Sequence, residues 1–137
     1  MSRDGAALLA VIMLYFPMGY FFLTSPTFLL VRLHIPQVMR LMRGHFNGSL
    51  IWVISAGLFS TGAFAFAGRP GLSAVSGGIT AFAYAMRRWL LQRMDEHIAR
   101  ILSGDVAATR PLRRLHWTGM ACNAAELAIV LSFTQGI

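Results

Sequence analysis

Three polar side chains interrupt the otherwise apolar segment 113–130, which reads RRLHWTGMACNAAELAIV. His116, Asn123 and Glu126 are separated by seven and then three residues, and this spacing places them on one face of an α-helix. An imidazole can ligate haem or a metal ion, and a carboxylate inside an apolar segment can carry a proton or pair with a cation. The spacing therefore predicts a row of polar groups that faces inward from the last helix.

Glu126 is the member of this row that is most costly to bury. An ionised carboxylate near the centre of a bilayer costs about 2.5 kcal/mol or more. Counting inward along the other apolar segments reaches Tyr20 at the same depth and comes close to Ser55 and Thr80. We expect these three residues to form a buried polar cluster with Asn123 and Glu126. Within it, Glu126 is either neutral and hydrogen-bonded or paired with a cation or a ligand.

Two histidines are the candidate cofactor ligands. His45 and His116 stand at corresponding ends of two apolar segments, and facing histidines at one depth are how helical bundles hold haem or a metal ion. The alternative is that both are interfacial histidines without a ligand. Asn47, Arg87 and Arg88 reach the same level, so we expect them to form a cytoplasmic interface beside the histidines. The sequence contains no motif of a dedicated metal site, and the cofactor, if there is one, is not identified.

The elements that position these residues follow from the distribution of charge. The chain has 137 residues, of which 56% are hydrophobic and 12% charged, about half the charged fraction of a soluble domain. Four long segments are free of charge except for Glu126, and each is long enough to cross a bilayer. The sequence predicts an all-α polytopic membrane protein that forms a single domain over residues 1–137. Its antiparallel bundle of four transmembrane helices covers about residues 5–31, 46–68, 71–91 and 113–135.

The arginines orient this bundle. The twelve basic residues are all Arg, and ten of them lie in or beside the first and third connections, against only Arg3 and Arg69 on the other side. The positive-inside rule places these connections in the cytoplasm. We therefore expect a multi-pass protein of the bacterial inner membrane with both termini on the non-cytoplasmic side. The same rule accounts for the net charge of +7 without a nucleic-acid partner. Residues 89–102 predict an amphipathic cytoplasmic extension between helices three and four.

The start of the last helix resembles a known group of proteins. Arg114, Leu115 and His116 open this helix, and Asn123 follows two turns later. This pattern and the four-span layout resemble small four-helix bacterial membrane proteins of unknown function, some of which are called anthrone-oxygenase-like. The resemblance implies a compact four-helix membrane fold and no particular activity. It touches only His116 and Asn123, and it has no counterpart for Glu126.

Three functions remain open from the sequence. The first is an accessory or structural subunit of a larger membrane complex or a homo-oligomer, whose partners are the lipid bilayer and other membrane subunits or further copies of the chain. Small residues at four-residue spacing favour it, and motifs typical of enzymes are absent from the sequence. The second is a haem-, metal- or quinone-binding redox protein that uses His45 and His116 with Glu126 and Asn123. The third is proton-coupled transport through an oligomer centred on Glu126. The lack of catalytic motifs favours a non-enzymatic protein and leaves an enzyme open.

Overall fold

The computed structural model describes residues 2–135, and the regular elements in this range are all helices. Met1 and residues 136–137 of the predicted domain lie outside the described residues. The expected all-α class is confirmed. The four long helices are α1 (Arg3–Thr24), α2 (Pro36–Phe66), α3 (Pro70–Leu102) and α4 (Thr109–Thr134). Two short 3₁₀ helices, η1 (Ser25–Leu29) and η2 (Val106–Ala108), follow α1 and precede α4.

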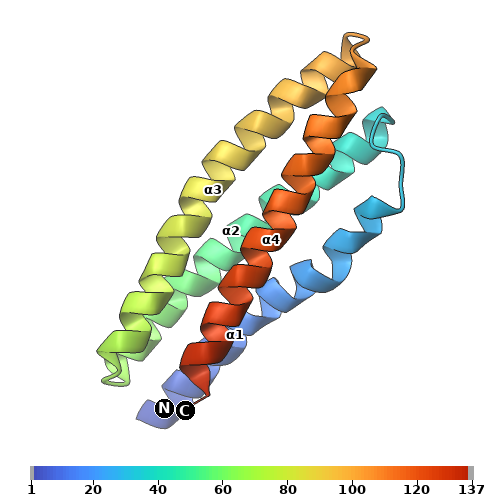
Figure 1. Cartoon of the computed structure of the whole chain (residues 1–137). Helices are drawn as coiled ribbons and strands as arrows, with labels where there is room; N and C mark the ends of the chain where they lie inside the picture. Colours follow the sequence, from blue (N-terminus) through green and yellow to red (C-terminus); the bar gives the residue numbers. More distant parts are fainter. Residues whose placement is uncertain (1, 136–137) are drawn as a thin grey trace.

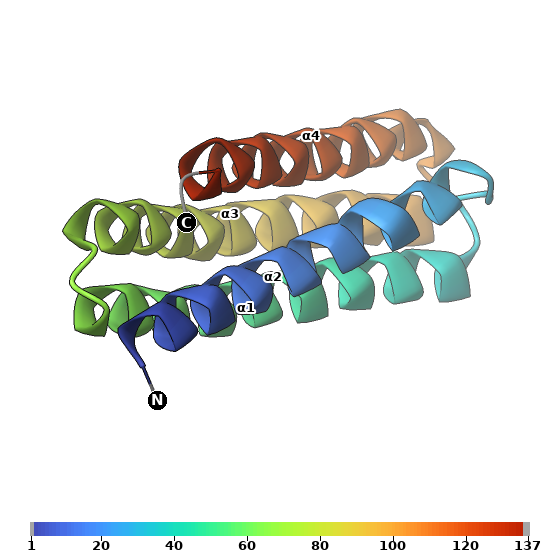
Figure 2. The same ribbon diagram turned by 90° about the horizontal axis from the view of Figure 1, so that it is seen from below.

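The four helices run alternately up and down as an antiparallel bundle (Figure 1). Both termini lie at the same end as the α2–α3 turn, which we call the terminal end. The α1–α2 connection and the α3–α4 turn lie at the opposite end, which we call the arginine end. Figure 2 shows α2 and α3 side by side, with α1 crossing α2 and α4 lying along α3. α4 also contacts α1, so each helix packs against two neighbours.

Prolines and glycines mark the ends of the two central helices. Pro36 and Pro70 occupy the first positions of α2 and α3, where the missing N–H leaves no hydrogen bond unmade. Gly68 after α2 and Gly104 after α3 have φ values of 72° and 105°. These left-handed conformations are accessible to glycine at little cost and stop each helix at a sharp turn. The antiparallel reversals are therefore specified locally.

α2 and α3 are longer than the predicted spans. α2 begins at Pro36 rather than at residue 46, and α3 continues to Leu102 rather than ending at residue 91. The amphipathic extension expected between helices three and four is thus a continuation of α3, which at 33 residues is about 50 Å long. Met94 and Ile98 of this extension are buried in the same hydrophobic cluster as Met39 and Met42 at the start of α2. Burial of this apolar face keeps both helices regular beyond the predicted boundaries.

The interior contains two separate hydrophobic clusters. The cluster at the arginine end is built from large side chains such as Met42, Phe46 and Leu112. The cluster at the terminal end uses small residues of α1, including Ala7 and Ala10, together with larger side chains from the other helices. Small side chains allow helix backbones to approach closely. The polar residues of α4 lie where these two clusters meet.

Composition supports fewer spans than expected. Of the described residues, Arg3–Leu29 and Pro36–Phe66 form the two segments that are long and apolar enough to cross a membrane. α3 and α4 do not reach the same apolar character. α3 has a Gly- and Ser-rich first half and arginines in its second half, and α4 contains the polar residues Asn123 and Glu126.

Candidate functional site

The polar row of α4 lies in the interior of the bundle. His116, Asn123 and Glu126 are all buried, and the side chain of Glu126 is only 7% exposed. Leu112 and Gly119 share this buried face, in keeping with the helical repeat. The row spans the region between the two hydrophobic clusters, with His116 nearer to the arginine end.

Asn123 and Glu126 line an interior cavity between the two hydrophobic clusters. Its volume is about 20 Å³, which is room for about one water molecule. Ser49 of α2 and Phe82 of α3 complete its polar and aromatic walls. The side-chain amide of Asn123 is partly satisfied, because Nδ2 donates a hydrogen bond of 3.1 Å to the backbone oxygen of Met18. Asn123 therefore ties α4 to α1.

Glu126 lies at the boundary between this cavity and the outside of the bundle. It also lines an outward groove of about 340 Å³ between α3 and α4. Within residues 2–135 its carboxylate has neither a hydrogen-bond partner nor an ion-pair partner. Phe82 and Cys122 line both the cavity and the groove. Sequence reasoning missed these two residues, although Cys122 lies one helical turn before Glu126 and is on the same face.

Three members of the expected polar cluster lie elsewhere. Tyr20 is 47% exposed, with its ring beside those of His45 and Trp52, so its assignment to the buried cluster is wrong. Ser55 is exposed as well, and its assignment is also wrong. Thr80 is buried, but its hydroxyl donates to the backbone oxygen of Ser76 at 2.8 Å and lines a different groove from Glu126. Depth along each helix does not determine the direction in which a side chain points.

His116 holds the end of α1 in place. Its Nε2 atom lies 3.0 Å from both the hydroxyl and the backbone oxygen of Ser25. Because a carbonyl oxygen only accepts, the contact to this oxygen requires a proton on Nε2. The Nδ1 atom is buried without a partner among the described residues, which leaves an unused lone pair there. The structure thus assigns His116 a contact with the start of η1.

The arrangement of the two histidines does not fit axial ligation of a haem. The Nε2 atom of His45 lies 3.3 Å from the Thr24 hydroxyl, as that of His116 lies against Ser25. The rings of Phe28 and Phe46 each pack against both imidazoles, with ring centroids 5.6–6.3 Å apart. The nitrogen atoms that ligate haem most readily are therefore engaged, and aromatic rings occupy the space around them.

Arg113 adds a second tie between α4 and the end of α1. Its guanidinium donates to the backbone oxygens of Phe28 and Leu29 at 3.5 Å and of Val31 at 3.1 Å. These carbonyls at the end of η1 carry partial negative charge, which a cation stabilises. Sequence reasoning counted Arg113 only as an orienting charge, because the carbonyls that it meets come from a distant segment.

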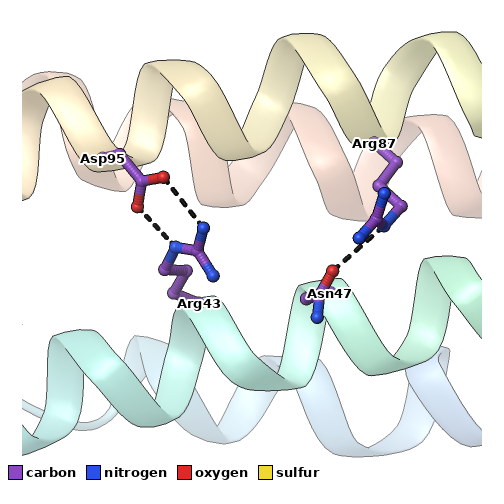
Figure 3. Close-up of polar contacts among 4 residues, drawn as sticks. All are labelled: Arg43, Asn47, Arg87 and Asp95. Carbon is purple, nitrogen blue, oxygen red and sulfur yellow. Dashed lines mark hydrogen bonds and ion pairs between the residues drawn. The ribbon is translucent and has the colours of Figure 1, made fainter.

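The expected cytoplasmic interface is divided. Figure 3 shows Arg87 of α3 directed at Asn47 of α2, with its Nε atom 3.0 Å from the amide oxygen. Closer to the arginine end, about one turn from Asn47 along α2 and two turns from Arg87 along α3, Arg43 forms a two-pronged ion pair with Asp95 that sequence reasoning missed. Arg88 is exposed and takes no part in the Asn47 contact. The interface thus joins α2 to α3 but does not include the histidines.

The remaining side-chain groupings in the described part of the chain are weaker candidates for a functional site. No set of three or more His, Cys, Asp or Glu side chains in the described part of the chain is placed to hold a metal ion. The unpaired Glu126 at the α3–α4 groove is the strongest candidate for chemistry. Comparison of the chain with protein-family models, with curated proteins and with solved structures finds no match.

Proposed function

We propose that this chain is an integral protein of a bacterial inner membrane, in which all four helices cross the bilayer. The character of the exterior supports this placement. Beyond Arg87, the exposed face of α3 carries charges such as Arg93 and Glu96, as in a water-exposed helix. Before Arg87, its exposed face carries large apolar groups such as Phe82 and Tyr84. The same change of character occurs near Arg43 in α2 and Arg114 in α4.

A belt free of Asp, Glu, Lys and Arg except for Glu126 surrounds the bundle on the terminal side of this boundary. We define the belt as residues 5–31, 44–66, 70–86 and 115–134. The shortest stretch, residues 70–86 of α3, is about 26 Å long, close to the 30 Å of a hydrocarbon core. Glu126 is the one acidic or basic side chain among the belt residues apart from histidine, and it is buried. Every helix exposes large apolar side chains within the belt, such as Phe16, Leu58, Phe82 and Leu131.

The contacts inside the belt are those that membrane helices use. Hydroxyls of small residues donate to backbone oxygens of neighbouring helices, as Ser60 does to Ala10 at 2.9 Å. Ser76 donates to the oxygen of Gly57 at 3.1 Å in the same way, between α3 and α2. Without water inside a bilayer, such polar ties and close backbone contact hold helices together. This packing supports the placement of α3 in the membrane beside α1 and α2.

Cysteine labelling tests the placement and its orientation. In a Cys122→Ser background, which removes the natural thiol, Ser2→Cys and Ser103→Cys each introduce one exposed thiol at opposite ends of the bundle. We expect a membrane-impermeant maleimide to label Ser2→Cys on intact cells with a permeabilised outer membrane. We expect it to label Ser103→Cys only after the inner membrane is opened. Labelling of both sites, or the reverse pattern, would contradict the proposal.

Within the membrane, we propose that the chain acts as an accessory or structural subunit of a larger complex or a homo-oligomer. One observation carries this role: the space available for binding lies on the outside of the bundle. The interior cavity holds about 20 Å³, whereas three grooves in the belt measure about 340, 400 and 470 Å³. The groove on α1 runs past Gly19, and that between α2 and α3 runs past Gly77. Grooves over small residues are where membrane helices dock.

Native mass spectrometry tests the subunit role. We expect the tagged chain, extracted from its own membrane in mild detergent, to appear in assemblies heavier than the 15.1 kDa of one chain. Substitution of Gly19 by Leu fills the α1 groove and should shift the distribution towards single chains. Gly48→Leu provides the matched control, because Gly48 lies outside the three grooves and has open space around it. Recovery of single chains alone would overturn the subunit role without affecting the membrane placement.

The unpaired carboxylate supports a second candidate, proton-coupled transport through an oligomer centred on Glu126. Glu126 is in contact both with the interior cavity and with the outward groove, so a proton on it could be exchanged with either. We expect proton flux into liposomes that contain the protein, and its loss in Glu126→Gln. Glu96→Gln, an exposed carboxylate outside the belt, serves as the control. Flux that is the same in wild type and Glu126→Gln would rule this candidate out.

A further inference from the structure

The groove between α3 and α4 combines an apolar wall with one carboxylate. Its lining from α3 is apolar, and from α4 it is apolar except for Glu126 and Cys122. Gly78 and Ala125 leave the space open because their side chains are absent or small. The volume of about 340 Å³ lies within the range of small-molecule sites, about 300–1,000 Å³. In the proposed membrane placement the groove opens to the lipid.

Glu126 has no counter-charge in the described part of the chain. It is 93% buried, since 7% of its surface is exposed, and no described residue donates a hydrogen bond or forms an ion pair with its carboxylate. The nearest arginine on its own helix is Arg114, twelve residues or about 18 Å away. Arg87 of α3 is already bound to Asn47. A carboxylate in apolar surroundings requires a charge partner or a proton, and residues 2–135 supply no partner.

We propose that this groove binds a lipophilic organic cation, such as an ammonium or phosphonium ion with hydrophobic substituents. Glu126 supplies the opposite charge, and Phe82, which lines the same groove, has an aromatic ring of the kind that attracts cations. Ile79 and Ile129 provide apolar contact for the substituents. The cation enters sideways from the lipid, because the groove lies on the outside of the bundle. The inference depends on the proposed membrane placement and is independent of the subunit role.

Equilibrium binding to the purified full chain in lipid nanodiscs tests the proposal. The probe is tetraphenylphosphonium, and tetraphenylborate, which has the same shape and the opposite charge, is the matched ligand control. We expect saturable binding of the phosphonium to the wild type. We expect its affinity to fall by about tenfold or more in Glu126→Gln, because truncating one partner of a buried charge pair is costly. Glu96→Gln, which removes an exposed carboxylate of α3, should leave the affinity unchanged.

A second pair of variants keeps the test decisive if Glu126→Gln fails to fold. Ala125→Phe fills the groove from α4 and should abolish binding of the phosphonium. Ala128→Phe places the same side chain at an exposed position of α4 outside the groove and should preserve binding. Absence of binding to the wild type, equal binding of the borate, or equal affinity in Ala125→Phe would each overturn the proposal. The cysteine labelling described above separates these outcomes from a failure of the membrane placement.

Discussion

Gly119 of α4 lies directly against the ring of Phe46 of α2. A Cβ atom at Gly119 would overlap Cε1 of this ring and stand 2.9 Å from its Cζ. The ring itself cannot move freely, because it is buried between Phe21 and His116. The missing side chain at residue 119 is thus what lets α4 close over the cluster at the arginine end.

We therefore expect Gly119→Ala to lower the free energy of unfolding by about 1–3 kcal/mol, the usual cost of overpacking. Gly62→Ala is the matched control, since a Cβ atom there meets nothing within 4 Å. It should leave stability unchanged or raise it by up to about 1 kcal/mol through better helix propensity. Thermal unfolding in detergent, followed by circular dichroism, measures both. An unchanged free energy of unfolding in Gly119→Ala would show that the ring of Phe46 can shift at little cost.

The hydrogen bond between Ser25 and His116 predicts a difference between two serine substitutions. Ser25→Ala should destabilise the protein by about 1 kcal/mol, because it removes the hydroxyl partner of a buried imidazole while the backbone contact remains. Ser55→Ala should change stability by less than about 0.5 kcal/mol, since Ser55 is exposed. The same unfolding assay compares the two. Equal effects would mean that Ser25 contributes nothing through His116.

The ion pair between Arg43 and Asp95 predicts compensation between charge reversals. Arg43→Asp and Asp95→Arg each place like charges together and should each lower the unfolding temperature. The double reversal should recover most of the loss. The coupling should not exceed about 1 kcal/mol, and it should weaken in high salt, because both side chains are partly exposed. Additive effects in the double variant would argue against pairing in solution.

The three tryptophans predict an order of depth in the bilayer. Trp89 and Trp117 are exposed near Arg88 and Arg114, whereas Trp52 is exposed about 13 Å inward from Arg43. In single-tryptophan variants, we expect lipids brominated deep in the acyl chain to quench Trp52 most strongly. Lipids brominated near the headgroup should quench Trp89 and Trp117 most, as is typical of interfacial tryptophan. Uniform quenching at all depths would contradict the proposed boundary.

The positions of the four helices and the polar row of α4 could be predicted from the sequence. Charge-free runs located the helices because arginines cluster where the belt ends, and the 3.6-residue repeat placed Asn123 and Glu126 on one face. The rotation of α1 could not be predicted in this way. α1 buries the small residues Ala7 and Ala10 and exposes the large side chains of Phe16 and Tyr20. Hydrophobicity does not distinguish these two faces when both are apolar, so Tyr20 was placed on the wrong one.

The lengths of α2 and α3 show a second limit of prediction from the sequence. Arginines between residues 32 and 43 and after residue 86 indicated connections or a separate extension. The decisive fact is tertiary, since Met39 and Met42 of α2 and Met94 and Ile98 of α3 are buried in one hydrophobic cluster. A periodic pattern of apolar residues predicts that one face of a helix is buried. It does not predict which other helix packs against that face. The groove residue Phe82 escaped prediction for the same reason.

The unbroken course of α3 has a mechanical consequence. A continuous helix resists bending, and α3 carries the groove at Phe82 and the ion pair at Asp95 on one rod of about 50 Å. The Asp95–Arg43 ion pair joins this rod to α2 at the arginine end. An occupant of the groove that separates α3 from α4 would therefore tilt α3 as a rigid helix and displace its charged end. In the proposed membrane orientation, binding in the groove would then be detected as movement of the cytoplasmic end of α3.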